Sequence, residues 1–306
     1  MTPAGAKRPL AGSLAVLLAV TIWGGVAVVA KLVDDVDGLT LGFHRLWIGA
    51  LATVAVFVAR GGRVTRRLLW LCLPGGLAFA LDIVLFFSAL KDTTVANATV
   101  IGALQPALLL LVVGRLFGEK VTPSAIGLTL TAILGVVVVM YASSGTPVWS
   151  LRGDMLALGA LFAWTWYFVA SKQVRRHLTA FEFLAGMMIV ATLAVAPLAL
   201  LTNHRLEPGG VEGWAWISLL ALGSGGVGHL LVSWAHDHID LSVMSLLTLA
   251  VPVVAVISAA VFLGEAITAL QVTGMAIVLA ALAVVVLRTN GPAVEPAPEE
   301  PVAAVG

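Results

Sequence analysis

The chain is divided into about ten apolar runs, most of them long enough to cross a lipid bilayer. Hydrophobic residues make up 60% of the sequence, charged residues only 11%, and the mean hydropathy is +1.06. A run of about 20 apolar residues spans the hydrocarbon core of a bilayer. Lipid offers the backbone no hydrogen-bond partners, so each run must satisfy its own as a helix. The pattern predicts an all-α membrane protein with ten transmembrane helices.

Short charged or turn-forming segments separate the runs and set the predicted boundaries. We expect spans at residues 11–30, 41–59, 68–90, 94–114, 123–142, 154–172, 180–201, 214–235, 241–263 and 268–288. The connecting loops, including 143–153 between the two halves, are mostly too short for a soluble domain. Residues 1–10 are a predicted cytoplasmic terminus. Residues 289–306 are a predicted disordered tail, because their Pro, Glu and Ala residues bury little apolar surface.

Basic residues are unevenly distributed between the two predicted sides of the membrane. With the amino terminus inside, the outer loops hold only Lys31, Lys91, Arg152 and Arg205. The inner segments hold Lys7, Arg8, Arg60, Arg63, Arg66, Arg67, Arg115, Lys120, Lys172, Arg175, Arg176 and Arg288. This positive-inside bias predicts both termini in the cytoplasm. The expected location of such a multi-pass protein is the inner (plasma) membrane. The basic residues set topology and form no patch for nucleic acid, so no nucleic-acid partner is expected.

The two halves of the chain share a repeated motif. An offset of 146 residues places Pro106-to-Glu119 over Pro252-to-Glu265. Two further pairs are spaced eight residues apart, Trp23 with Lys31 and Trp164 with Lys172. Because each half holds five spans, an odd number, the second half must enter the membrane in the opposite sense. Such inverted five-helix repeats, here 11–142 and 154–288, are typical of secondary transporters.

Together these motifs resemble the EamA-type members of the drug/metabolite transporter superfamily. The resemblance covers about residues 12–288 and rests on Trp23-Gly24-Gly25, Lys31, Arg45, Pro106…Gly118-Glu119, Pro252…Gly264-Glu265-x-x-Thr268 and Gly274. In one departure, Gly274 follows Glu265 by nine residues, whereas Gly127 follows Glu119 by eight. A shift of one residue turns a helix face by about 100°, so the packing of the fifth span is expected to differ. The resemblance implies alternating-access transport, commonly outward, of small metabolites such as amino acids or related organic compounds.

Two ionisable residues, Asp82 and His229, lie well inside predicted spans. A carboxyl at the centre of a membrane helix costs about 2.5–3.5 kcal/mol on insertion scales, so it usually faces a cavity or a partner. At the repeat offset Asp82 falls on Gly228, the neighbour of His229. Both residues are candidates for substrate binding and for coupling to a proton gradient; a structural hydrogen bond is the alternative for each. We expect them about 10 Å apart along the membrane normal, without direct contact.

Arg45, near the outer end of the second span, has two possible roles. Its side chain can snorkel to the lipid headgroups, or its planar guanidinium can bind an anionic substrate group such as a carboxylate. Trp23 and Trp164 hold equivalent positions in the two halves. Tryptophans commonly anchor membrane interfaces, but Trp164 lies well inside its run, so the pair is also a candidate lining for a substrate cavity.

Four positions in the repeated motif are expected to shape the helices. Pro106 and Pro252 lie within spans, where each frees a backbone carbonyl and permits a kink, so they are candidate hinges. Glu119 and Glu265 are expected to mark helix ends on opposite sides of the membrane.

Two other motifs do not support a cofactor or a metal. Residues 223–228 match G-x-G-x-x-G, but a dinucleotide site requires a preceding strand in a βαβ unit. The small residues instead favour close helix packing or a locally unwound, cavity-facing segment. His236-Asp237-His238-x-Asp240 lies in a short inner loop without further Cys or His to complete a metal site. The sequence contains no ATP-binding element, so any energy source is an ion or solute gradient.

Two other classes of protein stay open beside a carrier. A membrane-embedded enzyme needs polar catalytic groups clustered at one depth, whereas the ionisable residues here are sparse and scattered, so no enzymatic activity is expected. A channel or structural scaffold is the third class. The expected partners are a small-molecule substrate and the lipid bilayer, with protons as the candidate coupling ion; a homodimer stays open.

Overall fold

The computed structural model describes residues 8–33, 36–144, 150–202, 207 and 210–290. Within these ranges the chain is helical apart from short connections, and no strand is present. Nine of the described helical segments are long and apolar enough to cross a membrane, and a shorter apolar helix, Pro9–Gly24, is the tenth. The prediction of ten membrane helices is confirmed. The predicted disordered tail lies outside the described residues from residue 291 onward.

The observed helices agree with the predicted spans to within a few residues. The first half contains α1 (Pro9–Gly24) followed by α2 (Val26–Leu32), α3 (Gly38–Ala59), α4 (Arg66–Asp92), α5 (Val95–Gly102) followed by α6 (Gln105–Phe117), and α7 (Pro123–Ser144). The second half contains α8 (Leu151–Val174), α9 (Ala180–Leu201), α10 (Gly210–Leu220), the π-helix η1 (Ala221–Gly228), α11 (His229–Ala235), α12 (Leu241–Leu247), the 3₁₀-helix η2 (Thr248–Ala250), α13 (Val251–Leu263) and α14 (Ala269–Asn290).

The fourth and ninth spans of the chain show how local sequence shapes these helices. The fourth span breaks between α5 and α6, and Pro106 is the second residue of α6. In the ninth span, Pro252 is likewise the second residue of α13, after the short 3₁₀ turn. Proline suits the first turn of a helix because the backbone N–H that it lacks would have no partner there. The two candidate hinge prolines therefore stand at equivalent helix breaks.

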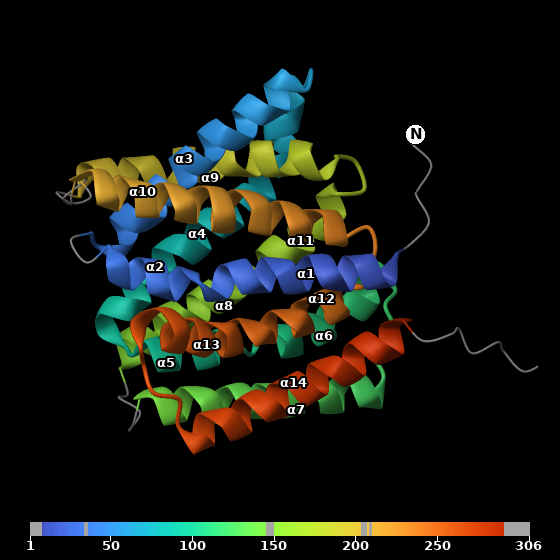
Figure 1. The fold of residues 1–306 in the computed structure, drawn as a ribbon. Coiled ribbons are helices and arrows are strands. Elements are labelled where there is room, and N and C mark those ends of the chain that lie inside the picture. The colour runs from blue at the N-terminus through green and yellow to red at the C-terminus, as the bar shows by residue number, and fades with distance from the viewer. Residues whose placement is uncertain (1–7, 34–35, 145–149, 203–206, 208–209, 291–306) are drawn as a thin grey trace, which may run out of the picture.

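The fifth spans of the two halves, α7 and α14, pack side by side in opposite directions (Figure 1). Near the end of α7, the Ser143 hydroxyl accepts a hydrogen bond of 2.8 Å from Gln271, near the start of α14. Near the start of α7, Ser124 accepts one from Arg288, in the last turn of α14. Because α7 and α14 are equivalent elements of the two halves, this antiparallel packing shows that the repeat is inverted.

A close glycine contact joins the fifth spans of the two halves. A Cβ atom on Gly135 would lie 2.9 Å from the carbonyl oxygen of Gly274, and a Cβ on Gly274 would lie 2.8 Å from that of Gly135. Gly127, the residue that the sequence comparison set against Gly274, has no atom within 4 Å of a Cβ built there. The glycine that matters for helix packing in the first half is therefore Gly135.

Equivalent contacts also occur at the starts of the two repeats, near the beginnings of α1 and α8. A Cβ on Gly12 would meet Ile239 at 2.8 Å, and a Cβ on Gly153 would meet Thr93 at 2.7 Å. Gly153 corresponds to Gly12, and Ile239 to Thr93, at the two sequence offsets of the repeat. The beginning of α1 and the end of α14 lie at the same end of the bundle (Figure 1), as an even number of spans requires.

Candidate functional site

A cluster of polar and aromatic side chains lies where α1, α3, α4, α8 and α11 meet. Its centre is His229, which is 1% exposed. One nitrogen of the imidazole, Nε2, lies 3.2 Å from Nη2 of Arg45. The other, Nδ1, lies 2.9 Å from the hydroxyl oxygen of Tyr167. The rings of Phe79 and Trp23 pack around the imidazole, with centroid distances of 4.7 and 5.0 Å.

These hydrogen bonds assign the tautomer of His229. A guanidinium can only donate, so Nε2 of His229 must accept from Arg45. The hydrogen of the neutral imidazole then lies on Nδ1, which donates to the Tyr167 hydroxyl oxygen. If His229 were protonated, its Nε2 would carry a hydrogen and would face another donor, Nη2 of Arg45. Proton uptake by His229 therefore requires Arg45 to move away.

Asp82 supplies the negative charge of the cluster. It lies three residues after Phe79 on α4 and is partly exposed. Asp82 and Arg45 interact electrostatically, yet among the described residues no hydrogen bond or ion pair within 4 Å engages the Asp82 carboxyl. Nε of Arg45 is also buried without a partner in this part of the chain. Arg45 thus contacts His229, interacts with the charge of Asp82 and keeps donor capacity for a ligand.

The structure brings the predicted aromatic residues into the same cluster. The rings of Trp23 and Trp164 meet edge to face at 5.8 Å, and Trp164 stacks on Tyr167 at 5.1 Å. Asp82, His229, Arg45, Trp23 and Trp164, all five candidates for the substrate pathway, therefore lie around one centre. The guanidinium of Arg45 reaches the buried His229, so in this structure it points into the bundle.

The glycine-rich segment 223–228 forms most of the π-helix η1, which widens the eighth span beside the cluster. The Ser224 carbonyl accepts a hydrogen bond of 3.2 Å from Nε1 of Trp23. A Cβ on Gly228 would lie 2.5 Å from that same Nε1, so only glycine leaves room for the indole. Of the two alternatives, close packing is observed, in a π-helix rather than an unwound segment; π-bulges often mark functional sites.

Sequence reasoning named no role for several residues of this region. Tyr167 is fully buried and completes the hydrogen-bond chain to His229. Its spacing of three from Trp164, on the same helix face, was the available signal. Gln105, next to hinge candidate Pro106, is 1% exposed, and neither atom of its amide has a partner among the described residues. Such a buried amide is costly, and nothing in the local sequence distinguishes it.

Glu119 joins the two repeats at one end of the bundle. Its carboxylate accepts hydrogen bonds from the backbone N–H groups of Leu241 and Ser242, at 2.7 and 3.0 Å, and from the Ser242 hydroxyl at 2.7 Å. Lys172 lies 3.3 Å from the same carboxylate. Gly118, with a φ of 70°, is the C-cap of α6, and Glu119 follows it directly, at a helix end as expected. Glu119 also caps α12 of the other repeat.

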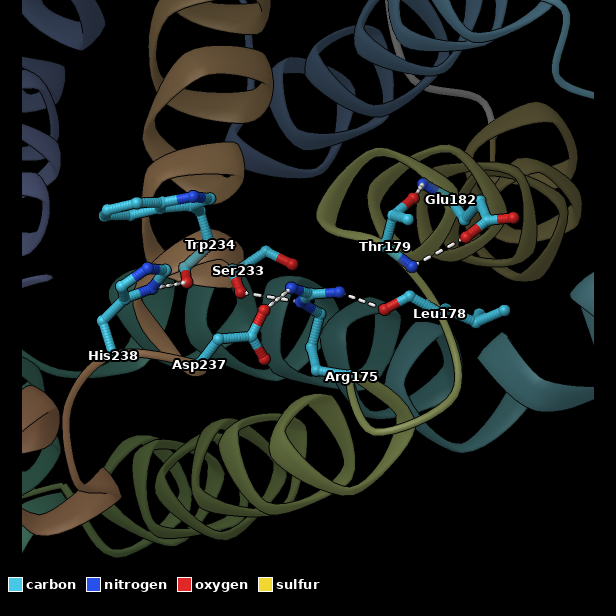
Figure 2. Close-up of polar contacts among 8 residues, drawn as sticks. All are labelled: Arg175, Leu178, Thr179, Glu182, Ser233, Trp234, Asp237 and His238. Atoms are coloured by element: carbon cyan, nitrogen blue, oxygen red, sulfur yellow. Dashed lines mark hydrogen bonds and ion pairs between the residues drawn. The ribbon is translucent and has the colours of Figure 1, made fainter. Parts of the chain in front are cut away.

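A second polar group at this end surrounds Arg175 (Figure 2). Its guanidinium donates to the carbonyls of Ser233 and Leu178 and pairs with the Asp237 carboxylate. Nδ1 of His238 lies 3.0 Å from the Trp234 carbonyl oxygen. His236 is buried, which lowers its pKa well below the ordinary value, and the charges of Lys172 and Arg175 lower it further. Through its ion pair with Arg175, Asp237 links α8 to the loop after α11.

The fold and this cluster define the class of protein. Ten membrane helices in two inverted halves surround a buried centre that holds a cation, a carboxyl and aromatic rings. A model of the EamA-like transporter family matches residues 10–141 and 151–287, once in each half. The chain belongs to this family and is a multi-pass membrane transporter.

Several named exporters are similar to this chain. The aromatic amino acid exporter YddG of Ancylobacter novellus is 28% identical over 243 residues, which cover 77% of this chain and 83% of the relative. A probable amino-acid metabolite efflux pump of Salmonella typhimurium is 28% identical over 284 residues, 87% of this chain and 91% of the relative. The pseudopaline exporter CntI of Pseudomonas aeruginosa is 26% identical over 212 residues, 69% and 72%.

A solved crystal structure supports the fold. It superposes with a TM-score of 0.80 and 24% sequence identity, covering 91% of this chain and 97% of the other. At this identity the similarity shows the fold alone.

Proposed function

We propose that this protein is a secondary active exporter of amino acids with aromatic or other bulky apolar side chains, working by alternating access in the inner membrane. The observation that carries the proposal is the partly unsatisfied Arg45 beside Asp82, enclosed by aromatic rings. The names of two exporters similar to this chain support it, since one is an aromatic amino acid exporter and the other a probable amino-acid metabolite efflux pump.

The charges of the cluster match those of a zwitterion. The guanidinium of Arg45 suits an α-carboxylate, because its planar fork donates two parallel hydrogen bonds. The Asp82 carboxylate suits the α-ammonium. The rings of Trp23, Trp164 and Phe79 offer faces and edges for an aromatic side chain, and such pairs contribute about 0.5–1.5 kcal/mol beyond area burial.

Coupling to protons follows from competition at Asp82. A carboxyl that holds a proton no longer attracts an ammonium, so proton and substrate exclude each other at this position. That exclusion is the requirement for exchanging protons against an outgoing substrate. His229 acts as a neutral acceptor that orients Arg45, as long as the contact between Nε2 and Nη2 persists.

Movement of the two repeats would open the centre to either side in turn. The helix breaks before Pro106 and Pro252 are the proposed hinges, because backbone hydrogen bonds are already interrupted there. The hydrogen bonds from Leu241 and Ser242 to the Glu119 carboxylate would break when the end of the bundle that holds Glu119 opens. The positive-inside rule places that end, with both termini, in the cytoplasm.

The test is transport in proteoliposomes with labelled L-phenylalanine. Wild-type protein should show counterflow, which separates a carrier from an enzyme or channel, and should accumulate substrate when a pH gradient is imposed. Asp82→Asn should abolish accumulation driven by the gradient and leave the yield of folded protein intact. Asp92→Asn is the matched control, because Asp92 ends the same helix and pairs with the exposed Arg152. Unchanged accumulation with Asp82→Asn would remove Asp82 from the mechanism.

A further inference from the structure

A groove of about 390 Å³ lies on the outer surface of the bundle between α4 and α9. Its lining is apolar except at one end: Arg66, Leu69, Trp70, Leu73 and Leu77 from α4, with Val190, Leu193 and Ala194 from α9. None of these residues belongs to the central cluster. Leu77 is 47% exposed and Leu193 65% exposed, which places the groove on a face that meets lipid.

The length of the groove corresponds to one leaflet of the membrane. Arg66 is the first residue of α4, and Leu77 lies eleven residues further along the same helix stripe. At 1.5 Å per residue this distance is about 16 Å, roughly half of the ~30 Å hydrocarbon core. The groove therefore extends from the membrane edge to near the midplane, as a single acyl chain does.

Charge distinguishes the end of the groove at Arg66 from the rest of its lining. Arg66 is exposed, and Arg63 and Arg67 beside it are exposed as well. Arg66 forms no ion pair with any acidic residue that the structure describes. The acidic residue Glu182, at the start of the neighbouring helix α9, accepts a hydrogen bond of 2.7 Å from the backbone of Thr179 and, like the other described acidic residues, forms no ion pair with Arg66. Trp70, one turn after Arg66, is 60% exposed, as is typical of an aromatic residue at the headgroup level.

We propose that this groove binds an anionic phospholipid, with one acyl chain between α4 and α9 and the headgroup phosphate on Arg66. Arginine binds phosphate through paired, charge-assisted hydrogen bonds. A zwitterionic lipid offers the same chain but no net charge to the three arginines. The groove therefore favours phosphatidylglycerol over phosphatidylcholine, and its occupant holds the outer face of α4, the helix that carries Asp82.

The quenching of Trp70 fluorescence by brominated lipids tests this proposal. The wild-type protein is reconstituted in phosphatidylcholine vesicles with increasing fractions of brominated phosphatidylglycerol or brominated phosphatidylcholine. The difference from Trp70→Phe isolates the signal of Trp70. We expect half-quenching at a fraction of brominated phosphatidylglycerol at least about fivefold below that with brominated phosphatidylcholine, the preference that one basic residue near a membrane surface provides. Arg66→Gln should reduce the preference.

Arg115→Gln is the matched control, since Arg115 is exposed in the last turn of α6, outside the groove, and is predicted on the same side. It should keep the wild-type preference. Native mass spectrometry of the wild type, Arg66→Gln and Arg115→Gln gives a second readout through the phosphatidylglycerol retained. Equal quenching by both lipids, or an unchanged preference in Arg66→Gln, would overturn the proposal. A Trp70 shielded from both lipids in a dimeric protein would also overturn it, because a second copy would then fill the groove.

Discussion

The two repeats have the same arrangement of helices but contribute different ionisable residues to the central cluster. The third span of the first repeat, α4, is a continuous helix that carries Asp82. The third span of the second repeat is widened by the π-helix η1 and carries His229 directly after it. At the repeat offset, Asp82 corresponds to Gly228 and His229 to Ile83. The scaffold is symmetric, whereas the centre is not: Arg45 interacts with one carboxyl, Asp82, and with one neutral acceptor, His229.

The equivalent tryptophans show the same difference. Trp23 donates its indole N–H to the Ser224 carbonyl in the π-helix of the opposite repeat. Trp164 stacks on Tyr167 of its own helix. Identical residues at equivalent positions thus have different partners.

The largest effect is expected when the cation between the two repeats is removed. Arg45→Gln loses the proposed bond to the substrate carboxylate, and hydrogen bonds to charged groups contribute about 1.5–3 kcal/mol. Substrate affinity should fall roughly 10- to 100-fold, as calorimetry on the purified protein would measure. Arg60→Gln should retain affinity, because Arg60 lies at the end of α3 over the Phe181 ring. Wild-type affinity in Arg45→Gln would contradict the assigned site.

A smaller effect is expected when the π-helix loses its fit to Trp23. In Gly228→Ala the new methyl group would overlap the indole nitrogen at 2.5 Å, whereas in Gly225→Ala the nearest atom lies at 3.6 Å. Overpacking of this kind costs typically 1–3 kcal/mol. Thermal melting should therefore drop and transport should decrease in Gly228→Ala, with Gly225→Ala near wild type. Equal behaviour of the two variants would show that the indole does not need this space.

Tyr167→Phe tests the hydrogen bond that holds His229 as a neutral acceptor for Arg45. The substitution removes the oxygen that accepts from Nδ1 of His229, and an unsatisfied buried donor costs about 1–3 kcal/mol. Thermal stability in detergent should decrease accordingly. Nitrogen NMR of labelled histidine in the wild type should show His229 neutral with its hydrogen on Nδ1. A hydrogen on Nε2 would be incompatible with the contact to Arg45.

The smallest effect concerns His236, at the loop after α11. Burial and the charges of Lys172 and Arg175 lower its pKa in the folded protein, so below about pH 6.5 only the unfolded chain takes up this proton. Stability should be unaffected by His236 above that pH. It should decrease as the pH falls further, by up to about 1.4 kcal/mol per pH unit. His236→Leu should flatten the pH dependence of the melting temperature between pH 6.5 and 5; an unchanged slope would contradict the assignment.

The sequence predicted the helices and the repeat well because lipid leaves the backbone few alternatives. Ten apolar runs become ten helices, and the spacing of Pro106 and Glu119, repeated at Pro252 and Glu265, identifies the two halves. It also selected five residues that the structure gathers around one centre. The elements that it could not predict depend on packing between distant segments.

The contact of Arg45 with His229 is one such element. Placing the start of the second span at residue 41 set Arg45 one turn from the surface, but α3 begins at Gly38, so Arg45 lies about two turns deep. From there its long side chain reaches His229, 184 residues away in the sequence. Likewise the glycines at 223–228 are compatible with close packing or a locally unwound segment, and the sequence alone does not place Trp23 against Gly228.

The most direct test of the account is a cryo-electron microscopy structure of the protein with L-phenylalanine bound in lipid nanodiscs. We expect density for the amino acid against the rings of Trp23 and Trp164, with its carboxylate on Arg45 and its ammonium toward Asp82. Ligand density outside this cluster, or an Arg45 that still contacts His229 with no ligand group beside it, would contradict the central claim.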